Sequence, residues 1–425
     1  MIPGVSRLLL LLPSGTYKAP DFLDAARRLG ADVVVASETE QTLADAMGDR
    51  ALVVDLADPK GSAAKITALA ARLPLDAVVA VDDQGLLIAA LAAHELGLPA
   101  NDAEAVRRTR NKAAMRAALA AAAFPAAHVT EGGDRPALLQ PSYRVVGPGD
   151  DVVAAAEEIG WPVVVKPVSL SASRGVIRAD EPAAAKEAAA RVRAILDGDG
   201  HPGGEPILVE QYVPGEEVAV EALLRRGDLE VLAIFDKPDP LTGPFFEETL
   251  YVTPSRLPAE TKEAIGRAVA AAAAAIGLRE GPVHAELRID PAGTPWILEV
   301  AARTIGGLCA RTLRFAAGVT LEELVLRHAL GLPIDPRRER PAAGVMMLPI
   351  PKAGRLVAVH GQDQARAVDH ITALEISIPS GGIVRPLPEG DRYLGFLFAR
   401  ASGPAEVEEA LRAAHAALEV VIDGS

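Results

Sequence analysis

Short apolar runs alternate with longer amphipathic segments along the first hundred residues of the chain. The runs are rich in Leu, Val and Ala, which is typical of strands buried on both faces of a sheet. We expect strands at 7–12, 32–36, 52–56 and 77–81, and helices at 20–29, 42–47, 62–71 and 83–96. This alternation predicts an α/β domain in which helices cover both faces of a parallel sheet.

The carboxyl ends of these strands are the edge at which such a sheet binds ligands. Residues 13–16 and the sequence Asp82-Asp83-Gln84 would lie at this edge. The first strand is not followed by Gly-x-Gly-x-x-Gly, so the pattern does not favour a dinucleotide site. The domain therefore either holds a substrate or supports the segments that follow it.

A helix predicted over 101–125 carries a cluster of cations. It begins at Asn101 or Asp102, which are good N-caps, and it ends at Pro125. The cations are Arg107, Arg108, Arg110, Lys112 and Arg116. Such a run is either a solvated face or a set from which one or two cations point at phosphates.

Residues 151–212 form a small α+β unit of short strands and helices. We expect helices at 151–159 and 182–196, strands at 161–166, 176–178 and 207–212, and loops at 169–175 and 197–205. A small unit with flexible loops at both ends is typical of a lid that closes over a ligand.

The segment 281–307 predicts a hairpin, and it gives the strongest indication of a functional site. Its strands, VHAELRI and WILEV, flank the turn residues 290–293. A loop of two or four residues would place Glu286 opposite Glu299, or one pair away, on the same face. Like charges repel there, so the pattern predicts a cation between them, and hard oxygen ligands suit magnesium. The alternative is a pair of solvated glutamates on an exposed sheet face.

The remaining segments are simpler. Strands within 217–235 pair around the turn 225–228 and form another hairpin. A helix at 259–276 precedes the hairpin at 281–307. A helix at 320–330 follows the hairpin. Strand signals from residue 343 onward and a helix at 404–418 indicate an appended subdomain.

Composition narrows the class of protein. The chain has 425 residues, a net charge of −14 and one cysteine. The negative charge argues against a nucleic-acid partner, and the single cysteine excludes an intramolecular disulfide or a cysteine-cluster metal site. The apolar run at 8–12 is too short for the core of a signal peptide, and the run at 268–276 is too short to span a bilayer. We expect a cytoplasmic protein with no membrane partner.

Four local features point to phosphate chemistry. Lys166 ends an apolar strand, where burial of its charge calls for an anion. The loop 169–175 is rich in small hydroxylated residues that can bind phosphate oxygens. The strand 207–213 precedes the acidic pair Glu216-Glu217, suited to a purine and its ribose. Arg303 follows Glu299 by four residues and can clamp a phosphoryl group.

These features occur in the order found in ATP-grasp enzymes. Lys112, WPVVVKP, the Ser-rich loop, ILVEQYVPGEE and AELRI…WILEVAAR together resemble that superfamily from Arg108 to Gly307. Within the superfamily, SASRGV, KPDPLTGPFFEETLYVTPSRLP and GPVHAELRI are similar to signatures of L-amino acid ligases of the bacilysin type.

The resemblance implies an α/β and α+β multidomain protein with the ATP-grasp fold. An N-terminal Rossmann-like domain of the pre-ATP-grasp type would span residues 1–105. The ATP-grasp domain would span 106–340, with a small lid subdomain at about 125–213, and a C-terminal subdomain would span 341–425.

The resemblance also implies roles by position. The ATP-binding residues would be Lys112, Lys166, Ser171, Ser173, Gly175, Val176, Glu210, Gln211, Val213 and Glu217. Glu286 and Glu299 would hold two magnesium ions, with manganese as the alternative metal. The substrate-binding residues would be Glu248, Tyr251, Arg303, Gly306 and Gly307. Arg303, Lys166 and Glu248 would be the catalytic residues.

The chain departs from the family pattern at four positions. Ala301 stands where the superfamily often has asparagine, which would remove one metal ligand. Leu170 and Ala172 stand where glycines are usual, and Tyr251 replaces a histidine that the L-amino acid ligases have.

The function implied by this resemblance is ATP-dependent carboxylate–amine ligation. An amino acid or similar carboxylate would be joined to an amine or a second amino acid through an acyl phosphate, with release of ADP and phosphate. One alternative is a biotin-carboxylase-like enzyme that uses bicarbonate, and another is a degenerate module that binds a nucleotide without catalysis. The partners would be small-molecule substrates, with a homodimer left open.

Overall fold

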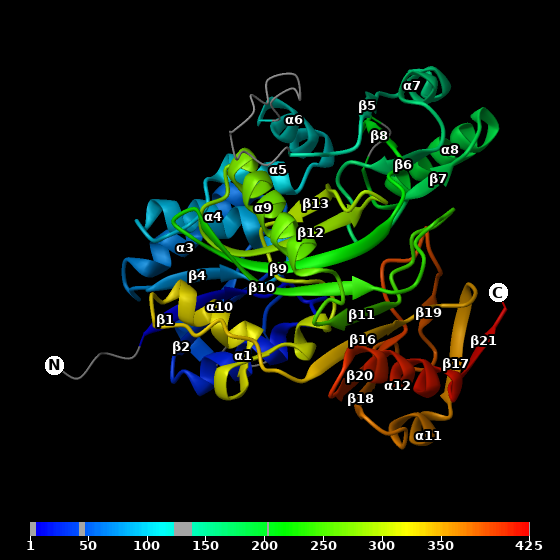
Figure 1. Cartoon of the computed structure of the whole chain (residues 1–425). Coiled ribbons are helices and arrows are strands. Elements are labelled where there is room, and N and C mark those ends of the chain that lie inside the picture. Colours follow the sequence, from blue (N-terminus) through cyan, green and yellow to red (C-terminus); the bar gives the residue numbers. More distant parts are fainter. Residues whose placement is uncertain (1–5, 42–46, 123–137, 202–203, 425) are drawn as a thin grey trace.

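The computed structural model describes residues 6–41, 47–122, 138–201 and 204–424 (Figure 1). The helix expected at 42–47 and the helix end expected at Pro125 fall almost wholly outside the described residues. None of the helices in the described ranges has both the length and the apolar character that a membrane span requires.

The N-terminal sheet is parallel, as the alternating pattern predicts. Its strand order is β3-β2-β1-β4, and its strands are β1 (Arg7–Leu11), β2 (Asp32–Ser37), β3 (Ala51–Val53) and β4 (Ala77–Ala80). Its helices are α1 (Ala19–Arg28), α3 (Pro59–Ala70) and α4 (Leu86–Glu95). Leu8 and Leu10 of β1 share a core cluster with α1, whereas Leu9 and Leu11 share another with α3 and α4. Alternation along one buried strand therefore supplies both faces of the sheet.

The largest sheet has eight antiparallel strands in the order β13-β12-β9-β10-β11-β16-β20-β18. These strands are β9 (Glu216–Arg225), β10 (Asp228–Lys237), β11 (Leu250–Thr253), β12 (Gly281–Ile289), β13 (Pro295–Ala301), β16 (Ala342–Leu348), β18 (Ile371–Ile376) and β20 (Gly395–Ala401). The last three come from the C-terminal part of the chain, so the boundary expected at residue 341 crosses a continuous sheet. The exact domain limits stay a prediction.

The two faces of this central sheet differ in chemistry. Val218 and Val220 of β9 and Leu287 of β12 pack against α9 (Ala259–Ile276) in one apolar cluster. Because side chains alternate along a strand, the neighbouring residues Glu217 and Glu286 emerge on the opposite face. That second face forms the floor of the site described below.

In the described residues between the N-terminal sheet and the lid, two helices stand in place of the single predicted one. They are α5 (Ala103–Thr109) and α6 (Lys112–Ala122). Asp102 caps α5 by accepting a hydrogen bond from the Glu104 amide at 2.7 Å. Asn111 accepts one from the Ala114 amide at 2.9 Å, so a second N-cap interrupts the helix just before Lys112.

The lid is a four-stranded sheet of order β5-β8-β6-β7 covered by two helices (Figure 1). Its elements are β5 (Tyr143–Val146), α7 (Val152–Ile159), β6 (Val163–Pro167), β7 (Ile177–Ala179), α8 (Pro182–Gly198) and β8 (Ile207–Gln211). Alternate residues Val163 and Val165 of β6 pack with Val192 and Leu196 of α8 in a separate core.

The C-terminal part adds further elements to the central sheet. They are β14 (Arg314–Phe315), β15 (Val319–Thr320), α10 (Leu321–Ala329), β17 (Gly354–His360), α11 (Gln362–Arg366), β19 (Ile383–Val384), α12 (Pro404–Ala416) and β21 (Glu419–Asp423). Strands β19, β17 and β21 form a small sheet of their own. Val407 and Leu411 of α12 pack on β16 and β20.

Candidate active site

A cavity of about 470 Å³ lies where the N-terminal sheet, the central sheet, the lid and the C-terminal part meet. One lining residue from each part is Asp83, Glu286, Lys166 and Tyr393 respectively. Residues 13–16 and 82–84, which were expected at the ligand-binding edge of the parallel sheet, contribute Pro13, Gly15, Thr16, Asp82, Asp83 and Gln84 to the wall.

The cavity collects nearly all of the residues that the sequence suggests for a site. Those in its wall are Lys112, Lys166, Ser171, Ser173, Val176, Glu210, Gln211, Val213, Glu217, Glu248, Tyr251, Glu286, Glu299, Arg303, Gly306 and Gly307. Gly175 is the exception among the suggested residues. Its amide donates a hydrogen bond to the Pro388 carbonyl at 3.0 Å, away from the cavity wall. The individual roles stay predictions, but the grouping is a structural fact.

The hairpin of β12 and β13 places Glu286 directly opposite Glu299. The route to that register differs from the expected one. Ile289 pairs with Pro295, which leaves a loop of five residues, and a bulge after Glu286 then shifts the register by one. Asp290 shapes this loop by accepting hydrogen bonds from the amides of Ala292 and Thr294, both at 2.9 Å. The bulge thus restores the pairing that an even loop would have given.

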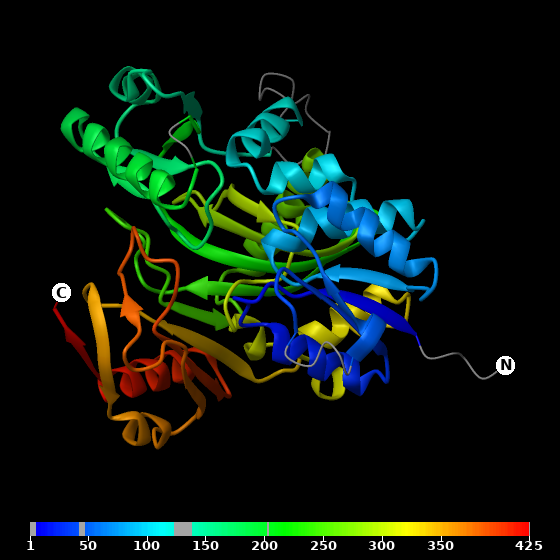
Figure 2. The same ribbon diagram turned by 180° about the vertical axis from the view of Figure 1, so that it is seen from behind.

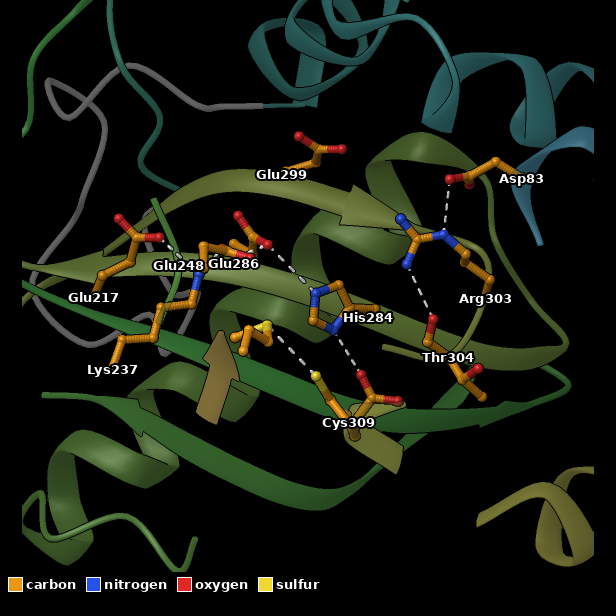
Figure 3. Close-up of polar contacts among 12 residues, drawn as sticks. Asp83, Glu217, Lys237, Glu248, His284, Glu286, Glu299, Arg303, Thr304 and Cys309 are labelled. Carbon is orange, nitrogen blue, oxygen red and sulfur yellow. Dashed lines mark hydrogen bonds and ion pairs between the residues drawn. The ribbon is translucent and has the colours of Figure 1, made fainter. Parts of the chain in front are cut away.

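Three carboxylates gather on the floor of the cavity, and we call them the acid cluster: Glu217, Glu248 and Glu286 (Figure 3). One oxygen from each lies within 4.8 Å of the others. The Lys237 ammonium reaches into the cluster, 2.8 Å from Glu217 Oε1, 2.5 Å from Glu248 Oε1 and 3.7 Å from Glu286 Oε1. Burial opposes the charge of Lys237, but the three carboxylates raise its pKa above the usual range.

The members of the acid cluster differ in their electrostatics. Burial and the Glu286 charge raise the pKa of Glu248 to about 7. Burial acts the same way on Glu286, but Lys237 and His284 outweigh it and hold the pKa of Glu286 below its usual range. Glu248 therefore holds a proton more readily than Glu286 does.

His284 extends this network to a fourth carboxylate, that of the buried Glu221. Its Nδ1 lies 2.6 Å from Glu221 Oε1, and its Nε2 lies 3.4 Å from Glu286 Oε1. Burial works against its positive charge, yet Glu221 and Glu286 raise the pKa of His284 to about 9. His284 also stands opposite Ala301 in the β12–β13 register. Ala301 therefore faces the His284 imidazole. The family resemblance predicts an asparagine at position 301.

The residues present fit a divalent cation of the magnesium type. Hard carboxylate oxygens converge there, and such oxygens are the ligands that magnesium prefers. Glu286 belongs to the acid cluster, whereas Glu299 is not among its members and pairs with Lys112, whose Nζ is 3.2 Å from Glu299 Oε2. The geometry thus adds Glu217 and Glu248 to the two expected ligands.

The opposite end of the cavity holds a buried charge triad of Arg116, Glu210 and Lys166. Arg116 Nε lies 2.7 Å from Glu210 Oε1, and Lys166 Nζ lies 2.6 Å from Glu210 Oε2. Although burial opposes its charge, Arg116 and Lys166 lower the pKa of Glu210 to about 2. Burial and the neighbouring cations Arg116 and Lys112 lower the pKa of Lys166, although Glu210 acts to raise it. The anion that Lys166 calls for is thus partly supplied by the chain.

The loop 169–176 closes over this end of the cavity. Lys112 Nζ donates a hydrogen bond to the Leu170 carbonyl at 2.6 Å, so the lysine links the loop to Glu299. Ala172 and Ser173 adopt left-handed backbone conformations, with φ of 57° and 56°. Such a conformation costs about 1–2 kcal/mol for a residue with a Cβ. This cost explains why glycine is usual at position 172.

Arg303 is held between the hairpin and the N-terminal sheet (Figure 3). Its Nε donates to Asp83 Oδ2 at 2.8 Å, and its Nη1 donates to the Thr304 carbonyl at 3.0 Å. Lys18, which is buried, donates to Thr304 Oγ1 at 3.1 Å and to the Val81 carbonyl at 3.2 Å. Burial opposes both charges of the Arg303–Asp83 pair, yet the pKa of Arg303 is raised and that of Asp83 is lowered.

Family models match three segments of the chain. An ATP-grasp domain model matches residues 159–312, an ATP-grasp N-terminal domain model matches 23–100, and the model of L-amino acid ligase C-terminal domain 2 matches 346–423. The chain contains an ATP-grasp domain. Its resemblance to L-amino acid ligases, expected from the motifs, is confirmed by the third match.

Proteins similar to this chain include ligases that are named for amino acids. Alanine–anticapsin ligase of Bacillus subtilis (strain 168) is 26% identical over 278 residues, which cover 62% of this chain and 55% of the relative. The crystal structure of L-amino acid ligase from Bacillus licheniformis is 26% identical, covers 99% of both chains and superposes with a TM-score of 0.77. The chain thus spans about half the length of the curated ligase that it matches.

The ATP-grasp fold is also shared with biotin carboxylase. The crystal structure of the biotin carboxylase–β,γ-ATP complex from Campylobacter jejuni superposes on this chain with a TM-score of 0.64. The two sequences are 15% identical, and the match covers 98% of this chain and 92% of that enzyme. At this identity the likeness shows the fold alone. The expected multidomain α/β and α+β architecture is confirmed.

Several polar residues of this ATP-grasp site escaped the sequence interpretation. They are Lys18, Glu221, Lys237 and His284. Three of them share one signal, because Glu221, Lys237 and His284 each interrupt or end an apolar strand. The same signal singled out Glu286 and Lys166. Lys18 gives no such signal, because it stands at the N-cap position of α1 and not in an apolar strand. Its ammonium contacts Val81 and Thr304, which are distant in the sequence.

Proposed function

We propose that this ATP-grasp protein is an ATP-dependent carboxylate–amine ligase. It would join an amino acid or similar carboxylate to an amine or a second amino acid, and release ADP and phosphate. The observation that carries the proposal is the shared cavity. Lys112 and Lys166 line it together with the acid cluster and Arg303, so a triphosphate and a carboxylate can meet there.

The proposed reaction has two steps. A substrate carboxylate oxygen attacks the γ-phosphorus of ATP, the bond to the β-phosphate oxygen breaks, and ADP leaves. The amine nitrogen then attacks the carbonyl carbon of the acyl phosphate. Inorganic phosphate leaves, the nitrogen loses a proton to solvent, and an amide remains. No protein nucleophile is needed, so positioning and charge stabilisation carry the rate.

The residues divide this work by their place in the cavity. Lys112 and Lys166 would neutralise phosphate oxygens beneath the loop 169–176. Magnesium, held by the acid cluster and Glu299 as two ions, would supply further charge neutralisation on the triphosphate, and manganese is the alternative metal. Arg303, fixed by Asp83, would stabilise the acyl phosphate and the tetrahedral adduct that follows it.

The substrate end of the cavity favours an amino acid over bicarbonate. Tyr251, Cys309 and Met347 line it, and Cys309 Sγ lies 3.7 Å from Met347 Sδ. A wall of this kind offers apolar contacts to a side chain, whereas bicarbonate has no apolar surface to bury. The complete set of charged residues likewise disfavours a module without catalysis.

Phosphate release tests the proposal. The protein is incubated with ATP and magnesium across a panel of paired amino acids, and products are identified by mass spectrometry. We expect phosphate and a dipeptide or other amide to form together for a subset of pairs. Release that depends on bicarbonate and needs no amino acid would support the carboxylase alternative. The absence of release in every combination would contradict both.

A further inference from the structure

A segment of the C-terminal part reaches across to the lid. We call residues 385–393 the latch segment; it connects β19 with β20 and extends toward the lid in Figure 2. Within it, the Pro388 carbonyl accepts a hydrogen bond from the Gly175 amide at 3.0 Å. The Glu389 carbonyl accepts one from Arg174 Nε at 3.3 Å. Both donors belong to the loop that covers the nucleotide end of the cavity.

The side chain of Glu389 makes a further contact with the lid. It forms a bidentate ion pair with Arg191 of α8, in which Nε lies 2.6 Å from Oε1 and Nη2 lies 3.0 Å from Oε2. The Arg191 guanidinium also lies 5.0 Å from the Phe245 ring centroid. Two planar groups matched in this way fix the angle at which the lid meets the latch segment.

The other end of the latch segment lines the active site. Asp391, Arg392 and Tyr393 are part of the cavity wall. Tyr393 packs edge-on against Phe396 of β20, with ring centroids 5.9 Å apart, and Tyr17 of the N-terminal part packs on the same ring at the same distance. Only a few residues therefore separate the groups that hold the lid from the groups that face a bound substrate.

We propose that the latch segment couples closure of the lid over the nucleotide to occupation of the substrate end of the cavity, with Glu389 as the positioning residue. The identity of the two ligands rests on the function proposed above. A ligand that orders Asp391–Tyr393 also orders Pro388 and Glu389, and these hold the loop 169–176 in place. Thermodynamic linkage then requires that the nucleotide strengthen substrate binding by the same factor.

The strength of the latch suits a lid that must open again. The side chains of Arg191 and Glu389 are 45% and 39% exposed. An exposed ion pair of this kind shifts an equilibrium by roughly twofold to fivefold. A contact of that size can bias the lid toward closure without trapping the product.

The test uses hydrogen exchange of the backbone amides in residues 169–176, with ADP and magnesium as the ligand. Glu389→Gln keeps the size of the side chain but removes its charge. Because both partners are exposed, the variant is expected to fold. We expect ADP to protect these amides about twofold to fivefold less in E389Q than in the wild type. The double variant R191E/E389R re-creates the ion pair in reverse and should restore the protection.

The matched control is Glu158→Gln, which removes the Arg144–Glu158 ion pair elsewhere on the lid. It should leave the exchange of residues 169–176 unchanged. Equal protection in E389Q and the wild type, or no recovery in the reversed pair, would overturn the proposal.

A second readout separates the latch from the ligase proposal. In the wild type, an amino-acid pair that supports phosphate release should lower the Kd for ADP, and this gain should disappear in E389Q. The KM for ATP should rise about twofold to fivefold while kcat changes little. If no pair supports turnover but exchange responds as predicted, the latch stands and the ligase proposal fails. If turnover occurs and exchange does not respond, the reverse holds.

Discussion

Arg303 and Asp83 form a 2.8 Å ion pair across 220 residues of sequence. The pair joins the end of the β12–β13 hairpin to the carboxyl edge of the N-terminal parallel sheet. The N-terminal domain, whose first strand is not followed by Gly-x-Gly-x-x-Gly, therefore orients the Arg303 side chain. This contact gives the N-terminal domain a direct part in the proposed chemistry.

Asp83→Asn should slow ligation without abolishing nucleotide binding. The asparagine retains one acceptor but loses the charge that orients Arg303, and misplacement of a charge-stabilising group costs about 10- to 100-fold in kcat/KM. Steady-state kinetics with a productive amino-acid pair would measure the loss. Asp32→Asn, which removes the Arg7–Asp32 pair in the same sheet, is the control and should retain full activity. Wild-type turnover in D83N would remove Asp83 from the account.

Arg303→Ala should be far more severe than D83N, since it deletes the guanidinium itself. Ligation should be abolished, whereas ADP binding measured by calorimetry should change little. We expect ligation and ADP binding to respond differently because Arg303 forms its ion pair with Asp83 of the N-terminal domain. Substantial ligation by R303A would show that another group stabilises the acyl phosphate.

If Glu286 and Glu299 bind magnesium, Glu286→Gln and Glu299→Gln should each raise the magnesium concentration that the reaction needs. Each substitution removes an anionic oxygen, and the concentration of magnesium needed for half-maximal ADP release should rise at least about tenfold. Titration of magnesium at fixed ATP measures the shift. Glu230→Gln, on an exposed part of β10, should behave as the wild type. Unchanged magnesium dependence in both variants would contradict the paired-carboxylate site.

Lys237→Met tests whether the acid cluster needs a cation. Removing the ammonium leaves buried carboxylates without their partner, which costs about 3–5 kcal/mol of unfolding free energy. Added magnesium should recover part of this loss, so it should raise the Tm of K237M more than that of the wild type. Equal shifts in the two proteins would show that the cluster does not attract a divalent ion.

The loss of folding stability in acid should depend on the charge triad of Arg116, Glu210 and Lys166. The folded-state pKa of Glu210, about 2, is below its unfolded value of 4.5, so its stabilisation is complete above pH 4.5. It is lost as pH falls toward 2, and the full amount is of order 3 kcal/mol. Urea unfolding of the wild type should therefore weaken over this range, and E210Q should show a flatter pH dependence. E158Q is the control, and an equally steep profile in E210Q would contradict the prediction.

The periodic patterns predicted most of the fold. Runs such as Leu8–Leu11 are long and uniformly apolar, and they become the central strands of the parallel sheet. The break between α5 and α6 was missed because helix-forming residues stand on both sides of Asn111, so the pattern continues through it. Only the structure shows that its side chain caps the Ala114 amide. Local propensity does not distinguish these two states.

The site was predicted where a charged residue interrupts an apolar strand, as at Glu286 and Lys166. The sequence could not show that Lys237 fills the acid cluster or that Arg116 shares Glu210. Those contacts depend on which strands pair and which helix covers them. The five-residue loop and its compensating bulge show the same limit. The pairing of Glu286 with Glu299 was anticipated from an even loop, whereas the chain reaches it by another path.

The central claim is that the carboxylate substrate is activated as an acyl phosphate. An amino acid labelled with ¹⁸O in its carboxylate tests this most directly, with mass spectrometry of the phosphate that is released. Transfer of the carboxylate oxygen predicts phosphate that carries one ¹⁸O atom for each amide formed. Unlabelled phosphate produced in step with the amide would contradict the account.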